Sequence, residues 1–444
     1  MTGEAKHINA MPTKAFFVDM LVRDIPTERA ILDLVDNCID GAKRLRPGSD
    51  ENFDGLWVKI HLDGDRFEIS DNCGGFDTET AMNYAFRFGR PADAKSTDYS
   101  IGQFGVGMKR ALFKFGRYFE VHSTTSYEKW AMKVDVDEWE HGTDWQFEFA
   151  ELIEDKAFTA DECGTRIMVN KLRPEIANKF SSEYFRRSLA ETIRAHQRQF
   201  LSSGLAIEFN GQHLTHTDLR VLSGGSYSPV VEEITFDRET EAPVLVRIIA
   251  GISESKPADA GWYIVCNGRV ILSADRSEAT GWNSVSEQKD GIPKFHNQYA
   301  RFRGIVFFDC SSSQKLPWNT TKTGLDEASA IWQSVFPKML DHTRTIIKFL
   351  NRLDEEFEEY GKNSPTLSTL AKEASALDVE KIRGARPFAW NMNPKAPGPK
   401  LTKIQYSREV AKIRTLMEAL GVNSAKAVGE TTFDMILSEQ GEDE

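Results

Sequence analysis

The chain has 444 residues, of which 40% are hydrophobic and 27% are charged, and its formal net charge at pH 7 is −12. This composition is typical of a globular protein with two or three domains, and the negative charge argues against a basic nucleic-acid sleeve while leaving room for a local basic patch. The five cysteines are scattered, odd in number and without CxxC spacing, which excludes a disulfide framework and a zinc site as readings of the sequence.

The first predicted element that carries chemistry is a helix over residues 30–42, with Thr27 as its N-cap. At about 100° per residue, Asp33, Asn37 and Asp40 share one helical face, and apolar side chains gather on the opposite face. Exposed helical faces usually mix charges, but no basic side chain interrupts this stripe. Oxygen ligands one turn apart suit Mg²⁺ or a carboxylate that orients water, and a solvated surface helix is the alternative.

A hairpin is predicted next, because residues 56–62 and 66–70 alternate apolar and polar side chains across a short turn. The second strand runs directly into the segment 71–75, which reads Asp-Asn-Cys-Gly-Gly. A carboxylate at a strand end, followed by paired glycines, lets the backbone turn sharply and leaves room for a flat ligand against the main chain. An ordinary Asx-Gly turn is the alternative.

A glycine-rich segment follows a predicted helix over residues 78–88, capped by Thr78, and a polar, turn-rich stretch over residues 89–100. Gly102, Gly105 and Gly107 then stand at GxxGxG spacing before another predicted helix. Glycines before a helix N-terminus offer unhindered N–H groups to an anion, and the helix dipole adds to the attraction, so a phosphate site is the natural hypothesis. The segment lacks the GK[ST] of a Walker A loop, and no βαβ pattern surrounds it.

Three further strands are predicted over residues 118–125, 130–136 and 145–152, extending an antiparallel sheet. A Gly164-Thr165 pair then precedes one more strand. Taken alone, this pair is a routine turn at the start of a strand.

In this order and at these separations, the segments 33–40, 71–75, 102–107 and 164–165 resemble the four boxes of the GHKL ATPase superfamily. That superfamily includes DNA gyrase B, the ninety-kilodalton heat-shock chaperones, histidine kinases, MutL and MORC proteins, and the string IGQFGVGM is especially close to the chaperone and MORC branches. The resemblance covers roughly residues 10–175. It implies an N-terminal α/β sandwich of the Bergerat type that binds ATP.

Position by position, the resemblance implies that Asn37 binds Mg²⁺ with support from Asp40. It implies that Asp71 accepts a hydrogen bond from the adenine amino group and that Thr165 assists through water. The remaining nucleotide contacts that it implies are Gly75, Gly102, Gln103, Phe104, Gly105, Val106, Gly107 and Lys109. For Lys109, a solvated helix lysine is an equally good interpretation. Residues 89–101 would form a lid over ATP.

Two residues depart from the family pattern. Asp33 stands where the hydrolysing branch usually has glutamate, and it would act as the general base from a side chain one methylene shorter. Because a water placed about 1 Å too far can cost about a hundredfold in rate, we expect slow turnover. Cys73 stands where the family usually has glycine, and the neighbouring Gly74 and Gly75 are expected to absorb the backbone constraint.

The middle of the chain reads as α+β, with a helix over residues 181–202, a strand over 205–209, a hairpin over 262–273 around an Asn-Gly turn, and a strand over 304–310. After an ATP-binding domain of this sort, the pattern resembles the transducer domain of the gyrase, MutL, chaperone and MORC branches. In those relatives a transducer lysine reaches the γ-phosphate. Lys322 best matches that lysine and Lys315 is the fallback, while a solvent-exposed loop lysine is the alternative reading.

The last hundred residues are predicted to be mainly helical, over residues 326–360 with an interruption at Pro337, 407–421 and 423–438. Between them, residues 385–403 are rich in Pro and basic side chains and read as a linker or extended arm. The arm carries Trp390, Lys395, Lys400 and Lys403, which could touch an acidic partner such as nucleic acid. The fold class is therefore α+β, with an ATP-binding domain over 1–175, a transducer-like domain over 176–345 and a helical region over 346–444.

These expectations combine into a cytoplasmic ATPase that binds Mg·ATP, hydrolyses it slowly and closes as an N-terminal homodimer when ATP is bound. The cytoplasmic location is expected because neither a signal-type core nor a run of about 18 apolar residues is present. A prokaryotic MORC- or MutL-like protein acting on DNA, or in defence against foreign DNA, is the favoured branch by analogy. The alternatives are a chaperone-like ATPase acting on protein clients and an ATP-binding switch with little hydrolysis.

Overall fold

The computed structural model describes residues 13–47, 52–87, 98–102, 107–225, 227–283, 292–319, 322, 324–360, 373–390, 402 and 404–440. The chain divides into two compact units, the first made of residues 1–353 with 367–393 and the second of residues 354–366 with 394–444. The predicted α+β class with a helical C-terminal region is confirmed. Across the described ranges, no helix combines the length and apolar character needed to span a bilayer.

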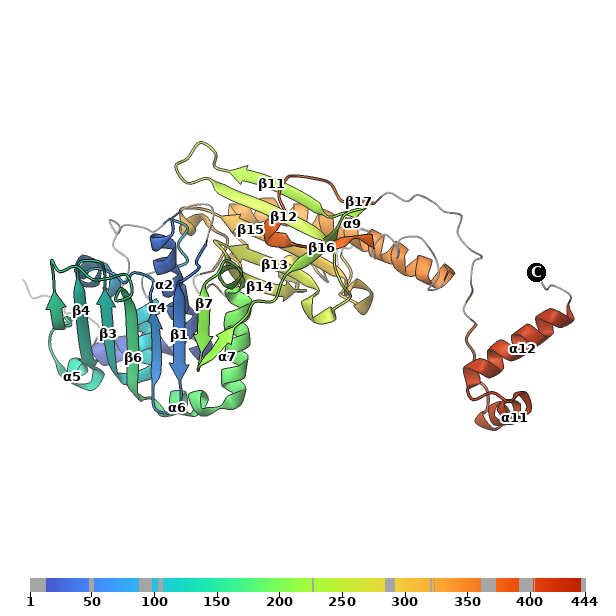
Figure 1. The fold of residues 1–444 in the computed structure, drawn as a ribbon, viewed down its shortest axis with the longest axis horizontal. Helices are drawn as coiled ribbons and strands as arrows, with labels where there is room; N and C mark the ends of the chain where they lie inside the picture. Colours follow the sequence, from blue (N-terminus) through green and yellow to red (C-terminus); the bar gives the residue numbers. More distant parts are fainter. Residues whose placement is uncertain are drawn as a thin grey trace, which may run out of the picture. The chain divides into compact units, whose positions relative to one another are not determined.

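The first sheet has eight strands in the order β5-β4-β3-β6-β2-β1-β7-β8 (Figure 1). They are β1 (Trp57–Leu62), β2 (Phe67–Asp71), β3 (Gly116–Thr124), β4 (Lys129–Asp135), β5 (Phe149–Ile153), β6 (Gly164–Leu172), β7 (Ala206–Phe209) and β8 (Gln212–Leu214). Strand β7 pairs with β1 in parallel, and the other neighbours are antiparallel. The sheet therefore continues past residue 175, where the sequence analysis places the end of the first domain, and that boundary stays a prediction.

The helices of this part of the chain are α1 (Lys14–Arg23), α2 (Thr27–Leu45), α3 (Thr78–Thr80), α4 (Gly107–Phe115), α5 (Val136–His141), α6 (Pro174–Ser181), α7 (Glu183–His196) and α8 (Arg198–Ser202). Helix α2 contacts α4, which in turn contacts β3 and β6. On the apolar side of α2, Ile31, Leu34 and Val35 are each at most 1% exposed. Hydrophobic burial thus fixes α2 to the core and turns its acidic face outward.

Two predicted helix starts are wrong in detail. Thr27 is the first residue of α2 rather than its cap, because the chain enters from Pro26 and no side chain caps the first turn. The second helix begins at Thr78, but its cap is Asp77, whose carboxylate accepts the N–H of Thr80 at 2.7 Å. After Thr80 the backbone widens into a π-helix over Ala81–Ala85, so this part of the chain does not form the regular helix predicted over residues 78–88.

The second sheet has the order β11-β12-β15-β13-β14. Its strands are β11 (Val230–Phe236), β12 (Val244–Ile252), β13 (Gly261–Cys266), β14 (Arg269–Asp275) and β15 (Phe302–Asp309). All residues of β13 are buried, which is why this segment reads as a continuous apolar run. The predicted Asn-Gly hairpin is confirmed, since Asn267 and Gly268 have φ of 48° and 85°, the left-handed pair that a tight two-residue hairpin needs.

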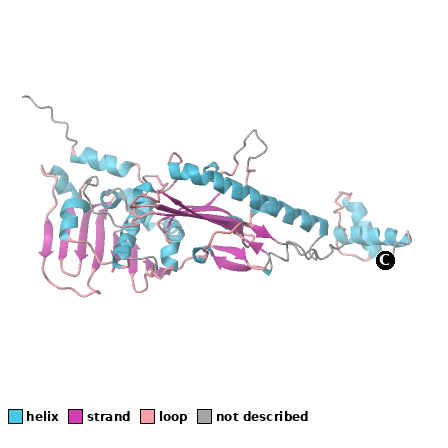
Figure 2. Cartoon of the chain, turned by 90° about the horizontal axis from the view of Figure 1, so that it is seen from above, coloured by secondary structure: helices cyan, strands magenta, loops and turns pink. Residues whose placement is uncertain are grey.

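The longest helix, α9 (Ala330–Tyr360), lies along the second sheet and contains Pro337 (Figure 2). Residues 373–390 then return to the first unit. There, β16 (Ser375–Asp378) pairs with β9 (Arg220–Ser223), and β17 (Ala389–Trp390) pairs with β10 (Tyr227–Ser228). Part of the predicted linker over residues 385–403 is therefore strand. Its three lysines, Lys395, Lys400 and Lys403, lie outside the described residues.

The second unit holds α11 (Val410–Leu420) and α12 (Ala425–Glu439), close to the predicted helices over residues 407–421 and 423–438. Short 3₁₀ segments occur at Pro257–Asp259, Glu278–Thr280, Asn297–Tyr299, Ser313–Lys315 and Val379–Lys381. The five cysteines are all buried and free.

Candidate functional site

The segments singled out in the sequence meet at one cleft of about 1460 Å³ between the helices of the first sheet and the second sheet. Nine of the predicted site residues line it: Asp33, Asn37, Asp40, Asp71, Gly75, Gly102, Gly107, Thr165 and Lys322. Lys109 does not line the cleft. Gln103, Phe104, Gly105 and Val106 lie outside the described residues, as does most of the predicted lid.

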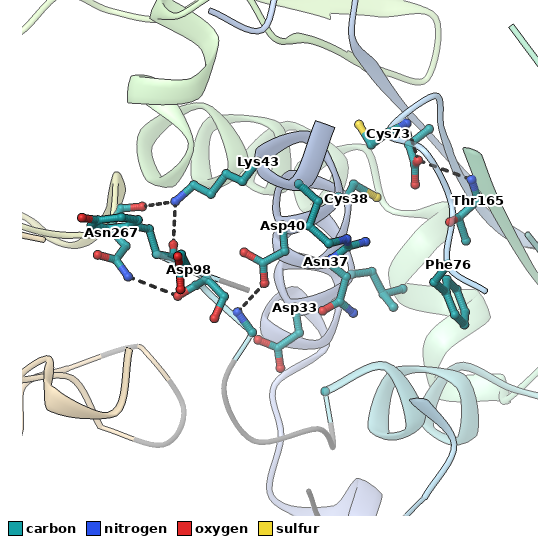
Figure 3. A pocket seen from close by; sticks show the side chains of 18 of the residues that line it. Asp33, Asn37, Cys38, Asp40, Lys43, Cys73, Phe76, Asp98, Thr165 and Asn267 are labelled. Atoms are coloured by element: carbon teal, nitrogen blue, oxygen red, sulfur yellow. Dashed lines mark hydrogen bonds between the residues drawn. The ribbon is translucent and has the colours of Figure 1, made fainter. Parts of the chain in front are cut away.

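One wall of the cleft is the acidic face of α2 (Figure 3). Asp33, Asn37 and Asp40 project from this helix into the pocket, with Thr165 and Phe76 on the opposite side. The carboxylate of Asp40 accepts the N–H of Ile101 and the N–H of Gly102, both at 2.7 Å. Asp40 therefore holds α2 against the backbone that enters the glycine segment. Such a contact is what a supporting role beside Asn37 would require.

The glycines allow that backbone to approach α2 more closely than any other residue would. A Cβ on Gly102 would lie 2.9 Å from an oxygen of Asp40 and 3.3 Å from the amide oxygen of Asn37. A Cβ on Gly107 would lie 3.0 Å from the carboxylate of Asp33, at the first residue of α4. The result is a cradle in which Gly102 and the first residue of α4, Gly107, lie close to a neutral amide oxygen and two carboxylates, and this arrangement suits a phosphate chain that carries a hard cation.

The far end of the cleft is built around Asp71, which is 8% exposed. Its carboxylate accepts the N–H of Cys73 at 2.8 Å and the N–H of Thr165 at 3.3 Å, so the structure brings together two residues predicted to recognise adenine. Burial raises the pKa of Asp71 to about 6. Gly164 has φ of 155°, and a Cβ there would lie 1.9 Å from the Asp71 carbonyl oxygen, which explains the Gly-Thr pair.

Cys73 is tolerated at the family's glycine position because the left-handed conformations fall on its neighbours. Gly74 and Gly75 have φ of 85° and 63°, whereas Cys73 has no positive φ. A Cβ on Gly75 would lie 2.4 Å from the Thr124 carbonyl oxygen. The expectation that the two glycines absorb the turn is consistent with this geometry.

A pH dependence of nucleotide affinity follows from the pKa of Asp71. If its ionised carboxylate accepts the adenine amino hydrogen bond, affinity should hold above pH 6 and fall about tenfold for each pH unit below it, because protonation removes the acceptor. Calorimetric titration with ATP from pH 5 to pH 8 measures this. The phosphates of ATP titrate in the same range, so an Asp71→Asn variant supplies the reference. Parallel profiles for the two proteins would contradict the assignment.

The candidate lysines differ sharply in position. The ammonium of Lys322 is 5% exposed and lies 3.2 Å from an oxygen of Asp36 and 3.7 Å from an oxygen of Asp33. Burial lowers the pKa of Lys322 to about 7. The fallback, Lys315, bonds Asp237 at 2.9 Å and does not line the cleft. The alternative reading of Lys322 as a solvent-exposed loop lysine is wrong.

Lys109 has an unexpected environment. It is 1% exposed, so its reading as a solvated lysine is wrong. Its ammonium donates to the carbonyl oxygens of Ala85, at 2.9 Å, and Arg87. These bonds tie α4 to the chain that leaves the π-helix. A phosphate contact by Lys109 stays a prediction.

A buried cluster of charged side chains, which the sequence did not predict, joins α2 to β14 beside the cleft. Asp36 and Arg269 are both 0% exposed and form an ion pair between α2 and β14. The other oxygen of Asp36 accepts a hydrogen bond from Gln197 at 2.9 Å. On the cleft side, Arg29 contacts the Asp33 carboxylate at 3.4 Å. The available signal was a carboxylate beside the apolar face of a helix, which requires a partner when buried.

Among the described residues, no group of three or more His, Cys, Asp or Glu side chains is arranged to hold a metal ion. A divalent cation would therefore depend on a ligand's phosphates as well as on Asn37, which is the usual manner for Mg²⁺.

One known protein family matches this part of the chain. Residues 25–165 match the family described as histidine kinase-, DNA gyrase B-, and HSP90-like ATPase. The matched span holds α2, the Asp71 turn, the glycine segment and Thr165, and it ends before the segment that carries Lys322. No curated protein matches the chain significantly.

Proposed function

We propose that the GHKL-type ATPase domain at residues 25–165 makes this chain a Mg²⁺-dependent ATPase that hydrolyses ATP slowly. The observation that carries the proposal is the cradle formed where Gly102 and Gly107 press against the acidic face of α2. Asp71, a buried carboxylate that lines the same cleft, is suited to the purine end of the nucleotide.

The roles of the side chains follow from their places in the cleft. Asn37 offers a neutral oxygen for Mg²⁺, which would neutralise phosphate charge when bound. Asp33 is the carboxylate that can orient a water and take its proton. Lys322 is the buried cation that reaches the same part of the cleft, where it would stabilise charge on the γ-phosphate.

Slow turnover is supported by the surroundings of Asp33. Besides being one methylene shorter than glutamate, its carboxylate contacts Arg29 at 3.4 Å and Lys322 at 3.7 Å. Both cations compete with a water molecule for the carboxylate oxygens. An ATP-binding switch with little hydrolysis is therefore a second candidate function, and Asp33 is the residue that favours it.

We further propose that ATP favours an N-terminal homodimer and that the second sheet acts as a transducer of the nucleotide state. The position of Lys322 on the loop that follows β15 supports the second point, because this side chain lines the cleft from outside the family-matched span. We propose two alternative roles for this ATPase, a MORC- or MutL-like role on DNA and a chaperone-like role on protein clients, and different measurements distinguish them. ATP-dependent, salt-sensitive retention of DNA would favour the first, and suppression of client aggregation would favour the second.

The experiment that tests the proposed function is single-turnover hydrolysis of ATP by the full chain, with Asn37→Ala alongside. We expect slow, Mg²⁺-dependent phosphate release from the wild type and none above background from the variant. Size-exclusion chromatography with a non-hydrolysable analogue is expected to show a dimer that Asn37→Ala does not form. The exposed amide of Asn178 on α6 offers a matched control, because Asn178→Ala removes the same group from a helix away from the cleft and should change neither result.

The two measurements separate the candidate functions. Nucleotide binding without phosphate release would identify the switch and exclude the enzyme. Wild type that neither binds nor hydrolyses ATP would refute the proposal for this domain.

A further inference from the structure

The backbone that enters the glycine segment is held from two sides. On one side, Asp40 of α2 accepts the N–H groups of Ile101 and Gly102. On the other side, the side-chain amide of Asn267 donates to the Ser100 carbonyl oxygen at 3.3 Å. Residues 98–102, which we call the loop anchor, are therefore bonded both to α2 and to the turn between β13 and β14.

Lys43 joins these two sides directly. Its ammonium donates to the Tyr99 carbonyl oxygen at 2.9 Å and to the Asn267 carbonyl oxygen at 2.8 Å (Figure 3). Both side chains are nearly inaccessible to solvent, with Lys43 at 7% and Asn267 at 2% exposure, and both line the cleft. A charged donor shared by two carbonyl groups fixes their separation more firmly than neutral contacts would.

The hairpin turn is also fixed to the rest of its sheet and to the core. The Asn267 side chain exchanges hydrogen bonds with the main chain of Cys310, accepting from its N–H at 2.9 Å and donating to its carbonyl oxygen at 3.1 Å. Cys310 directly follows β15, and the segment after it carries Lys322. A Cβ on Gly268 would lie 2.7 Å from the ring of Phe200, so the backbone of the turn packs closely against that ring.

We propose that Asn267 and Lys43 are positioning residues that transmit nucleotide binding at the glycine cradle to the second sheet. The inference rests on the proposed function, since it requires phosphates at the cradle. A ligand at the cradle lies against Gly102, which belongs to the loop anchor, and the bonds of Asn267 carry a shift of the loop anchor to β13, β14 and the end of β15. The route is separate from any direct contact of Lys322 with a phosphate.

The test is hydrogen exchange on the full chain, with and without Mg²⁺ and a non-hydrolysable ATP analogue, combined with steady-state kinetics. In the wild type we expect the analogue to slow exchange both in α4 and over residues 261–275. Asn267→Gly keeps the left-handed backbone but removes the side-chain amide. It should retain protection of α4, lose protection of residues 261–275, and lower kcat by about tenfold while KM changes by less than about threefold.

The chain offers a matched control in its other Asn-Gly turn. Asn210 has φ of 46°, and its side chain exchanges hydrogen bonds with the main chain of Leu62 at 2.9 Å and 3.0 Å, away from the cleft. Asn210→Gly should therefore leave exchange and kinetics as in the wild type. Lys43→Met should reproduce the effect of Asn267→Gly, and Lys43→Arg should restore much of the loss because a guanidinium can still donate to two carbonyl groups.

Three results would overturn the inference. The first is protection of α4 without any protection of residues 261–275 in the wild type, and the second is an Asn267→Gly protein that behaves like Asn210→Gly. The third is a KM that rises as much as kcat falls, which would make Asn267 a binding residue. If the wild type shows no protection of α4 and no nucleotide binding, the proposed function fails and the inference fails with it.

Discussion

Replacing Asp36 with alanine is expected to lower the free energy of unfolding by about 3–5 kcal/mol, as the loss of one partner from a buried ion pair usually does. Asp36 and Arg269 are both 0% exposed, and Lys322 shares the same carboxylate at 3.2 Å. The variant would leave two buried cations without their common counter-charge. Urea-induced unfolding, followed by tryptophan fluorescence, measures the change.

A more exposed pair, between a carboxylate of α2 and a lysine of α6, provides the control. Glu28 contacts Lys179 at 3.4 Å with both side chains more than a third exposed, so Glu28→Ala should cost only about 0–1 kcal/mol. The double variant Asp36→Leu with Arg269→Met replaces the pair by apolar groups and should recover most of the loss. An Asp36→Ala protein no less stable than Glu28→Ala would contradict the role of this ion pair.

The parts of the fold and site that the sequence predicts well are those governed by neighbours in the chain. The stripe of Asp33, Asn37 and Asp40 follows from the helical period, and the β1–β2 and β13–β14 hairpins follow from alternation and turn chemistry. The glycine positions are informative for the same reason, because the need of Gly75 or Gly164 for a left-handed backbone is local. The joint reading of four such segments pointed to the family whose model matches residues 25–165.

The parts that the sequence does not predict depend on which distant segments meet. Nothing local pairs Asp36 with Arg269, or Lys43 with Asn267, because these contacts arise only when the second sheet docks against α2. The parallel pairing of β7 with β1 is non-local in the same way. Lys109 is an example of a single residue whose surroundings the sequence does not predict. Its position on the helix is compatible with a solvated lysine or a phosphate-binding lysine. Tertiary packing instead places its ammonium against two carbonyl oxygens.

Replacing Lys322 with alanine is expected to lower kcat for ATP hydrolysis by about a hundredfold, the cost of removing one preorganised charge-stabilising group, while ATP affinity changes by less than about fivefold. The ammonium is buried at the cleft wall, 3.7 Å from the carboxylate of Asp33, and in the proposed mechanism it acts where charge develops on the phosphate. Arg29 and Arg269 remain as counter-charges for Asp33 and Asp36, so the fold should survive. Single-turnover kinetics and calorimetric binding separate the two effects.

Lys315 is the matched control, because it belongs to the same connecting segment but its ammonium is bonded to Asp237 and the Ala242 carbonyl oxygen outside the cleft. Lys315→Ala should leave turnover unchanged. Lys322 has φ of 51°, where alanine is strained, and Lys322→Asn removes the charge with a residue that tolerates this backbone, so it should reproduce the loss. Equal losses in Lys322→Ala and Lys315→Ala, or a Lys322 variant with weakened binding and normal kcat, would refute a role for Lys322 in the chemical step and leave charge stabilisation to Mg²⁺ and the main-chain cradle.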